Sequence, residues 1–125
     1  MADNQNAYDT YMTAGHDAAW EQNWDNAIRY YSLALKEFPE EAEALNNLGF
    51  VLRELGLKDQ AQESLRLAIK HDPNYVEAYF NMGNALGDIG QLREAIRYYN
   101  VATELRKGYR EAKFNRSLAK LSDGD

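Results

Sequence analysis

Asparagine recurs in this sequence at a spacing of 34 residues, at Asn47, Asn81 and Asn115. A side-chain amide carries both a hydrogen-bond donor and an acceptor, so it can pair with the backbone of another chain. A row of three such amides could hold an extended peptide without contacting its side chains. The spacing therefore makes peptide binding the first functional hypothesis.

Carboxylates recur with the same spacing, at Asp9, Glu43, Glu77 and Glu111. A negative row along a binding surface would favour a neutral or basic ligand. The alternative is structural, because a carboxylate near the start of a helix is stabilised by the helix dipole.

Enzymatic and metal-binding chemistry finds little support in the residue pattern. The two histidines, His16 and His71, have no histidine partner four residues away, and the chain holds no cysteine, so no metal site or disulfide is expected. The glycine-rich stretch 83–90 lacks the Lys-Ser/Thr pair of a phosphate-binding loop. No catalytic residues and no cofactor are predicted.

Composition indicates one domain, because 125 residues with 45% hydrophobic content can bury a substantial core. A net charge of −6 argues against a nucleic-acid-binding protein, which needs a basic face. There is no long apolar run and no secretory signal, so we expect no membrane association and a cytoplasmic protein.

The elements that would position these side chains follow from an internal repeat. Glycines at 15, 49 and 83, alanines at 27, 61 and 95, and alanines at 34, 68 and 102 all keep the 34-residue step. The predicted units are 8–41, 42–75 and 76–109. They are followed by a closing helix over 110–121 and a tail over 122–125.

Each unit is expected to hold two helices. Leu45, Leu48, Gly49 and Leu52 form the stripe of an amphipathic helix in the second unit. Gly56 ends that helix, and Gly90 does the same in the third unit. The first unit has Gln22-Asn23 at this turn, and we expect Asn23 to accept the positive φ that the turn requires.

These small, large and proline columns resemble those of the tetratricopeptide-repeat family over nearly the whole chain. The resemblance implies an all-α solenoid, a right-handed superhelix of three antiparallel helix pairs plus one capping helix. The first helix of each pair would line a concave groove. The candidate peptide-binding residues are then Asn47, Asn81, Asn115, Asn46, Asn84, Phe50, Phe80, Met12, His16 and Trp20.

Some members of that family clamp the C-terminal carboxylates of heat-shock chaperones with lysine, asparagine and arginine side chains. The matching positions in this sequence are Met12, His16, Asn47, Glu77 and Asn81. Only Asn47 fits, and Glu77 stands where the clamp has a lysine. We therefore predict no binding of a chaperone tail.

The last helix is expected to close the stack. Its outer columns are Lys113, Arg116, Ser117 and Lys120, while Phe114, Leu118 and Leu121 form a stripe predicted to pack backwards onto the third unit. At the other end of the chain, residues 1–7 are polar and are predicted to be disordered.

Charge is divided along the chain. Residues 1–90 contain 6 basic and 15 acidic side chains, whereas residues 91–125 contain 8 basic and 5 acidic ones. This basic end either solubilises the closing helix or docks an anionic partner or the acidic first unit of another copy. Its candidate residues are Arg106, Lys107, Arg110, Lys113, Arg116 and Lys120.

The function expected from the sequence is a protein-interaction adaptor that binds a peptide or protein segment in its groove. The alternative is a scaffold that self-assembles by head-to-tail contacts, which would make the chain a homo-oligomer. Fold alone cannot decide between them.

Overall fold

Seven α-helices make up residues 2–124, the part of the chain that this computed structural model describes, with side chains from residue 4 onward. No strand occurs in this range. The helices are α1 (Ala2–Trp20), α2 (Trp24–Glu37), α3 (Ala42–Glu54), α4 (Lys58–His71), α5 (Val76–Asp88), α6 (Leu92–Leu105) and α7 (Arg110–Asp123).

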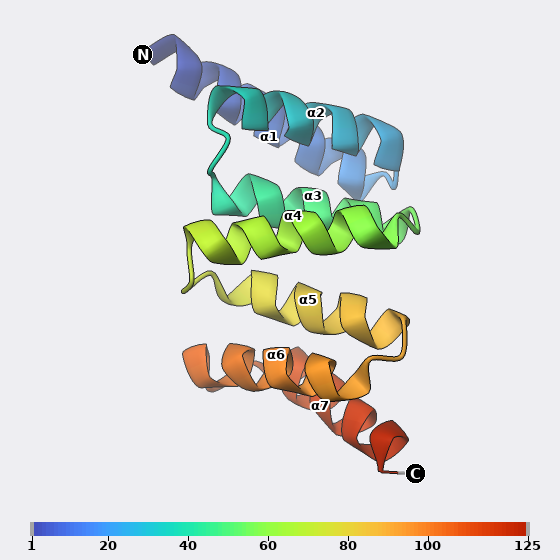
Figure 1. The fold of residues 1–125 in the computed structure, drawn as a ribbon. Coiled ribbons are helices and arrows are strands. Elements are labelled where there is room, and N and C mark those ends of the chain that lie inside the picture. Colours follow the sequence, from blue (N-terminus) through green and yellow to red (C-terminus); the bar gives the residue numbers. More distant parts are fainter. Residues whose placement is uncertain (1, 125) are drawn as a thin grey trace.

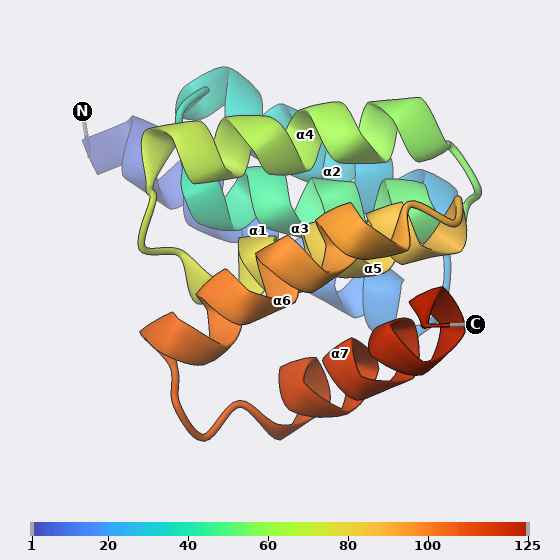
Figure 2. The same cartoon turned by 60° about the horizontal axis from the view of Figure 1, so that its bottom comes forward.

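The helices form three consecutive hairpins, α1–α2, α3–α4 and α5–α6, which stack one on the next (Figure 1). The last helix, α7, packs beside α6 and also contacts α5, and it lies along the outer side of the third hairpin (Figure 2). The N- and C-terminal ends of the described chain lie at opposite ends of the stack (Figure 1). The predicted all-α repeat solenoid of three helix pairs and one closing helix is confirmed.

Close contact within each hairpin depends on a glycine facing a large side chain. A Cβ atom on Gly83 would lie 2.5 Å from a ring carbon of Tyr99, and Gly15 stands in the same relation to Tyr31. In the second hairpin Gly49 faces Leu65, whose Cγ would be 2.6 Å from such an atom. The repeated glycine column therefore gives room to the residue that fills the centre of each hairpin.

The tight turn inside each hairpin needs one residue with positive φ. Gly56 and Gly90 supply it at 82° and 80°, and Gln22 takes this conformation in the first hairpin at 59°. The expectation that Asn23 would do so is wrong, because Gln22 is the residue 34 positions before Gly56. Asn23 instead caps α2, its side-chain oxygen accepting a bond of 3.3 Å from the backbone N–H of Asn26.

The N-terminal segment differs from the prediction of disorder over 1–7. Residue 1 lies outside the described range, but residues 2–7 form the first turns of α1. Local hydrogen bonds explain this, since Gln5 donates to Asp9 and the Thr10 hydroxyl donates to the carbonyl of Asn6, both at 2.9 Å. At the other end α7 continues to Asp123, so the predicted tail is helical up to that residue, and residue 125 lies outside the described range.

Buried side chains form three clusters that follow the stack. One lies between the first hairpin and α3, a small one around Ala42, Leu45, Ala68 and Ala78 joins the second hairpin to α5, and the largest lies in the third hairpin under α7. None of the helices within the described residues has the length and apolar character needed to cross a membrane.

Candidate functional site: the groove face

The first helices of the hairpins, α1, α3 and α5, together with α7, present equivalent positions on one face of the stack. We define this groove face by His16, Phe50, Asn84 and Leu118, which are each 34 residues apart. Three hollows lie along it, one at the N-terminal end of the stack and two between α5 and α7.

The hollow at the N-terminal end is aromatic and has a volume of about 560 Å³. Trp24 meets the ring of Phe50 edge to face at 6.4 Å, and His16 Nδ1 lies 2.8 Å from the hydroxyl of Tyr31. Trp20 also lines this hollow and is 89% exposed. The sequence predictions for His16, Trp20 and Phe50 therefore fall on one continuous surface.

Met12 does not belong to that surface. Its side chain is only 6% exposed and lies in the core cluster that joins the first hairpin to α3. The expectation that Met12 lines the groove is wrong, because its flexible thioether is buried in this core cluster, where such a side chain fills irregular space.

Four of the predicted asparagines are bonded to one another in pairs. Asn81 Nδ2 donates to Asn46 Oδ1 at 2.9 Å, and Asn115 Nδ2 donates to Asn84 Oδ1 at 2.9 Å. Asn84 Oδ1 also accepts a bond of 2.6 Å from the Tyr99 hydroxyl. These amides therefore join successive repeats, while Asn81 Oδ1, Asn84 Nδ2 and Asn115 Oδ1 form no hydrogen bond within the described residues.

Asn47 is the exception among the predicted asparagines. It is half-buried, and its side chain forms no hydrogen bond within the described part of the chain. Asn46, by contrast, is 4% exposed, so its amide is closed to any ligand.

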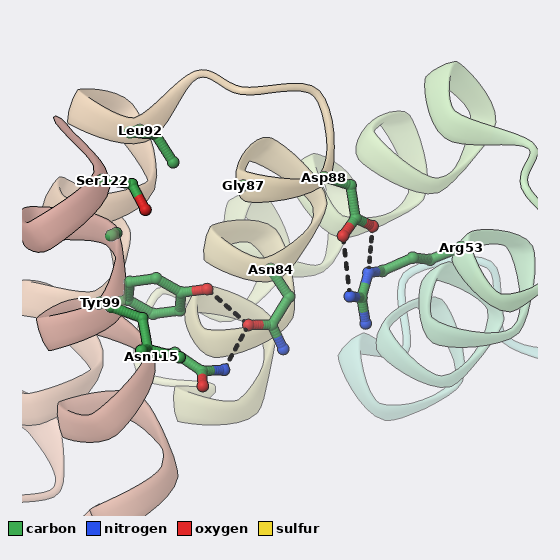
Figure 3. Close-up of a pocket in the computed structure, with 10 residues that line it drawn as sticks. Arg53, Asn84, Gly87, Asp88, Leu92, Tyr99, Asn115 and Ser122 are labelled. Atoms are coloured by element: carbon green, nitrogen blue, oxygen red, sulfur yellow. Dashed lines mark hydrogen bonds and ion pairs between the residues drawn. The ribbon is translucent and has the colours of Figure 1, made fainter. Parts of the chain in front are cut away.

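A second hollow, about 250 Å³ in volume, lies between α5 and α7 beside an ion pair that the sequence reasoning missed (Figure 3). Arg53 Nε and Nη2 donate to the two carboxylate oxygens of Asp88 at 2.5 and 3.0 Å. This pairing raises the pKa of Arg53 against the opposing effect of its partial burial. Figure 3 shows the ion pair on one side of the hollow and the Tyr99, Asn84 and Asn115 bonds on the other.

The third hollow, about 590 Å³, lies between α5 and the start of α7 and is lined in part by Phe114, the first residue of the stripe that the sequence predicts to pack backwards. Phe114, Leu118 and Leu121 are 63%, 48% and 70% exposed, so the expected backward packing of this stripe is wrong. The face of α7 that packs against the third hairpin carries small residues instead, with Ala112 fully buried and Ala119 nearly so. Small side chains allow the closer approach, and the larger ones remain exposed, with Phe114 lining the same hollow as Phe80.

The sequence models that match this chain agree with that geometry. Two models, each described as tetratricopeptide repeat, match residues 21–82 and 76–109. The chain belongs to the tetratricopeptide-repeat family.

Solved structures of several other proteins are similar over almost the entire chain. One is the TPR domain of Arabidopsis OM64, with 24% identity and a TM-score of 0.92. The match spans 95% of this chain and 98% of the OM64 domain. The first TPR domain of Spaghetti (RPAP3), solved with the HSP90 peptide SRMEEVD, is 20% identical with a TM-score of 0.92, and the coverages are 96% and 95%. MamA is 31% identical with a TM-score of 0.84, and the match spans 96% of this chain and 66% of the MamA chain. A search of curated protein sequences gives no significant match.

In this tetratricopeptide-repeat chain the acidic column is partly neutralised from within. Arg106 Nη2 lies 2.8 Å from Glu77 Oε2, and its guanidinium sits over the ring of Tyr109 at 4.8 Å. Burial of Glu77 opposes ionisation, but the hydrogen bond and charge of Arg106 lower the pKa of Glu77 overall. No comparable ion pair involves Glu43 or Glu111 among the described side chains.

The basic end is also less open than its composition suggests. Arg106 pairs with Glu77, and Arg116 Nη1 donates to Asn100 Oδ1 and Thr103 Oγ1 at 3.0 and 3.1 Å. The exposed members of the predicted set are Lys107, Arg110, Lys113 and Lys120, together with the outer part of Arg106. Within the described residues, no group of three or more histidine and acidic side chains could hold a metal ion.

Proposed function

We propose that this chain is a protein-interaction module that binds a segment of another protein on its groove face. The observation that carries the proposal is the exposure of Trp20, Phe114 and Leu121, at 89%, 63% and 70%, all on that face. Phe114, Leu118 and Leu121 form one exposed apolar stripe on α7, and such a patch commonly marks a protein-binding site, while Trp20 is exposed at the opposite end of the stack. The peptide bound to the TPR domain of Spaghetti (RPAP3) supports this use of the shared architecture.

The state of the groove amides favours a helical ligand over an extended one. An extended peptide must hydrogen-bond its backbone N–H and C=O groups to the groove or to water. Asn46 is buried, and Asn81, Asn84 and Asn115 each already use one polar atom within the chain, whereas apolar side chains stand exposed at both ends of the face. An amphipathic helix brings its backbone already paired and offers apolar side chains to such a groove.

Two features argue against the chaperone-tail clamp. Glu77 stands at a position where the clamp has a lysine, and Met12, at another clamp position, is buried. The carboxylates of a chaperone tail would therefore find no lysine at these two positions, and at one of them they would meet the carboxylate of Glu77, which Arg106 only partly neutralises. We expect no saturable binding of a peptide ending Glu-Glu-Val-Asp at micromolar concentrations.

A selection from a phage-displayed library of random peptides tests the proposed function directly. Peptides that bind the wild-type chain should lose at least about tenfold in affinity for the double variant Phe114→Ser, Leu118→Ser. The matched control is Leu57→Ser, Leu105→Ser, because these leucines are each 40% exposed but lie off the groove face. Recovery of no binder, or equal losses in both double variants, would contradict the proposal.

A further inference from the structure

The loops that join successive repeats have nearly the same backbone, so equivalent residues occupy equivalent places. The residue that follows the second helix has φ and ψ of −135° and 89° at Phe38, −141° and 90° at Asp72, and −134° and 97° at Arg106. The residue before the next helix is also extended, as Tyr75 and Tyr109 show. One repeat can therefore serve as a template for its neighbour.

In the third repeat, the loop before α7 and the start of α5 form a corner of the groove face, and this corner holds an arginine. Glu77 at the start of α5, Tyr109 before α7 and Arg106 in the loop come together there. The guanidinium of Arg106 pairs with the carboxylate at 2.8 Å and lies over the tyrosine ring at 4.8 Å. A carboxylate beside an aromatic ring is a favourable environment for such a cation.

The second repeat has the same carboxylate and the same tyrosine but lacks the cation. Glu43 and Tyr75 occupy the places of Glu77 and Tyr109, and Asp72 stands where the third repeat has Arg106. Neither Glu43 nor Asp72 forms an ion pair with any described side chain, and Asp72 Oδ1 accepts only the backbone N–H of Asn74 at 3.0 Å. The corner therefore holds two carboxylates with no counter-charge.

A buried phenol next to this corner also lacks a partner. Tyr8, from α1, is 6% exposed, and its hydroxyl forms no hydrogen bond within the described residues. Burial raises the pKa of Tyr8, and the charged groups that raise it further are Glu41, Glu43 and Asp9. For Tyr75 they are Glu43, Glu77 and Asp72, so every charged group that shifts the pKa of either phenol is a carboxylate.

We propose that Glu43, Asp72 and Tyr75, with Tyr8 behind them, form a binding site for an arginine side chain of the groove ligand. The guanidinium would take the place that Arg106 fills in the third repeat. Its planar group can pair with a carboxylate and stack on a phenol at the same time, which a lysine ammonium does less well. This site deepens the proposed function, since it adds a basic residue to the apolar segment.

Titration with N-acetyl-argininamide, followed by heteronuclear NMR, tests the site without a protein ligand. Saturable shifts are expected at the amides of Glu43 and Tyr75, with a dissociation constant on the order of millimolar. The neutral analogue N-acetyl-citrullinamide should cause none of them. Glu43→Gln should weaken binding about tenfold, whereas Glu111→Gln, the equivalent change in α7, should leave it unaltered. Equal shifts with citrullinamide would overturn the proposal.

Two exchanges between repeats sharpen this test. Asp72→Arg supplies the missing guanidinium within the chain, so it should abolish argininamide binding and raise the melting temperature. Arg106→Asp should create a second site, with new shifts at Glu77 and Tyr109. If Asp72→Arg still bound argininamide at Glu43, the proposed site would be wrong.

The outcomes separate this inference from the proposed function. Library peptides that bind the apolar groove without shifting Tyr75, together with no argininamide binding, would reject the arginine site alone. Argininamide binding at Glu43 with no library binder would reject the apolar groove alone.

Discussion

The side chain of Asn81 in α5 donates a hydrogen bond of 2.9 Å to the side chain of Asn46 in α3. The two residues belong to neighbouring repeats, and Asn46 is 4% exposed, so the bond lies between the hairpins rather than on the surface. A second bond, from Asn115 to Asn84, joins α7 to α5 in a similar way. Amide pairs thus hold successive repeats in register.

The first prediction concerns the stability that the Asn81–Asn46 pair contributes. Asn81→Ala leaves the buried oxygen of Asn46 without a donor, which should lower the free energy of unfolding by about 1–3 kcal/mol. Asn47→Ala is the control, because the Asn47 side chain is half-buried and bonds to no described residue. Urea denaturation of both variants measures the difference. Equal, small effects would show that the amide pair does not stabilise the stack.

The second prediction compares two glycines in α5. Gly83→Ala would place a Cβ atom 2.5 Å from the ring of Tyr99, which is buried and bonded to Asn84. The resulting overpacking should cost about 1–3 kcal/mol. Gly87→Ala meets no atom within 4 Å and should instead stabilise the helix by up to about 1 kcal/mol. Thermal melts of the two variants should shift in opposite directions, and a shift in the same direction would contradict the packing argument.

The limits of the sequence prediction have physical causes that these residues illustrate. The glycine column and its large partners follow the 34-residue period, so they could be predicted from spacing alone. The amide bonds could not, because Asn46 and Asn81 are 35 residues apart and Asn84 and Asn115 are 31 apart. A diagonal contact between repeats does not appear in any single column.

The closing helix shows a different limit. Hydrophobicity alone predicts that the stripe of Phe114, Leu118 and Leu121 packs against the core, because large apolar residues usually point inward. The better signal was the column of small residues, since Ala112 and Ala119 stand 34 residues after the buried Ala78 and Ala85. Comparing repeats indicates the buried face more directly than hydrophobicity does, and it places the large side chains on the groove face.

The third prediction concerns the strained turn of the first hairpin. Gln22 holds φ at 59°, where its equivalents are Gly56 and Gly90. A left-handed conformation costs a residue with a Cβ atom about 1 kcal/mol, so Gln22→Gly should stabilise the chain by about that amount. The reverse change in the second hairpin, Gly56→Gln, should destabilise it by a similar amount. Chemical denaturation checks both, and a loss of stability in Gln22→Gly would refute the assignment of strain.

The fourth prediction is a loss of stability at alkaline pH that depends on Tyr75. Burial, and then the carboxylate of Glu43, raises the pKa of Tyr75 from 10.0 to about 12. Because the folded-state pKa is the higher one, the stabilisation is complete below pH 10 and is lost as the pH rises from 10 to 12. Tyr75→Phe should therefore lose less stability than the wild type across this interval. Parallel loss in the two proteins, measured by denaturation at each pH, would contradict the raised pKa.

The last prediction concerns self-association through the basic end. Head-to-tail stacking would need the cations of α7 and the loop before it, but Arg106 and Arg116 are already engaged within the chain. Contacts between exposed charges are also screened by salt, so they should add little at physiological ionic strength. We therefore expect sedimentation to show a monomer at low and at high salt. The charge reversal Lys113→Glu, Lys120→Glu should alter neither this result nor the affinity of groove-binding peptides. Larger species at low salt that dissociate as salt is added, and that disappear in the reversed variant, would instead establish the scaffold.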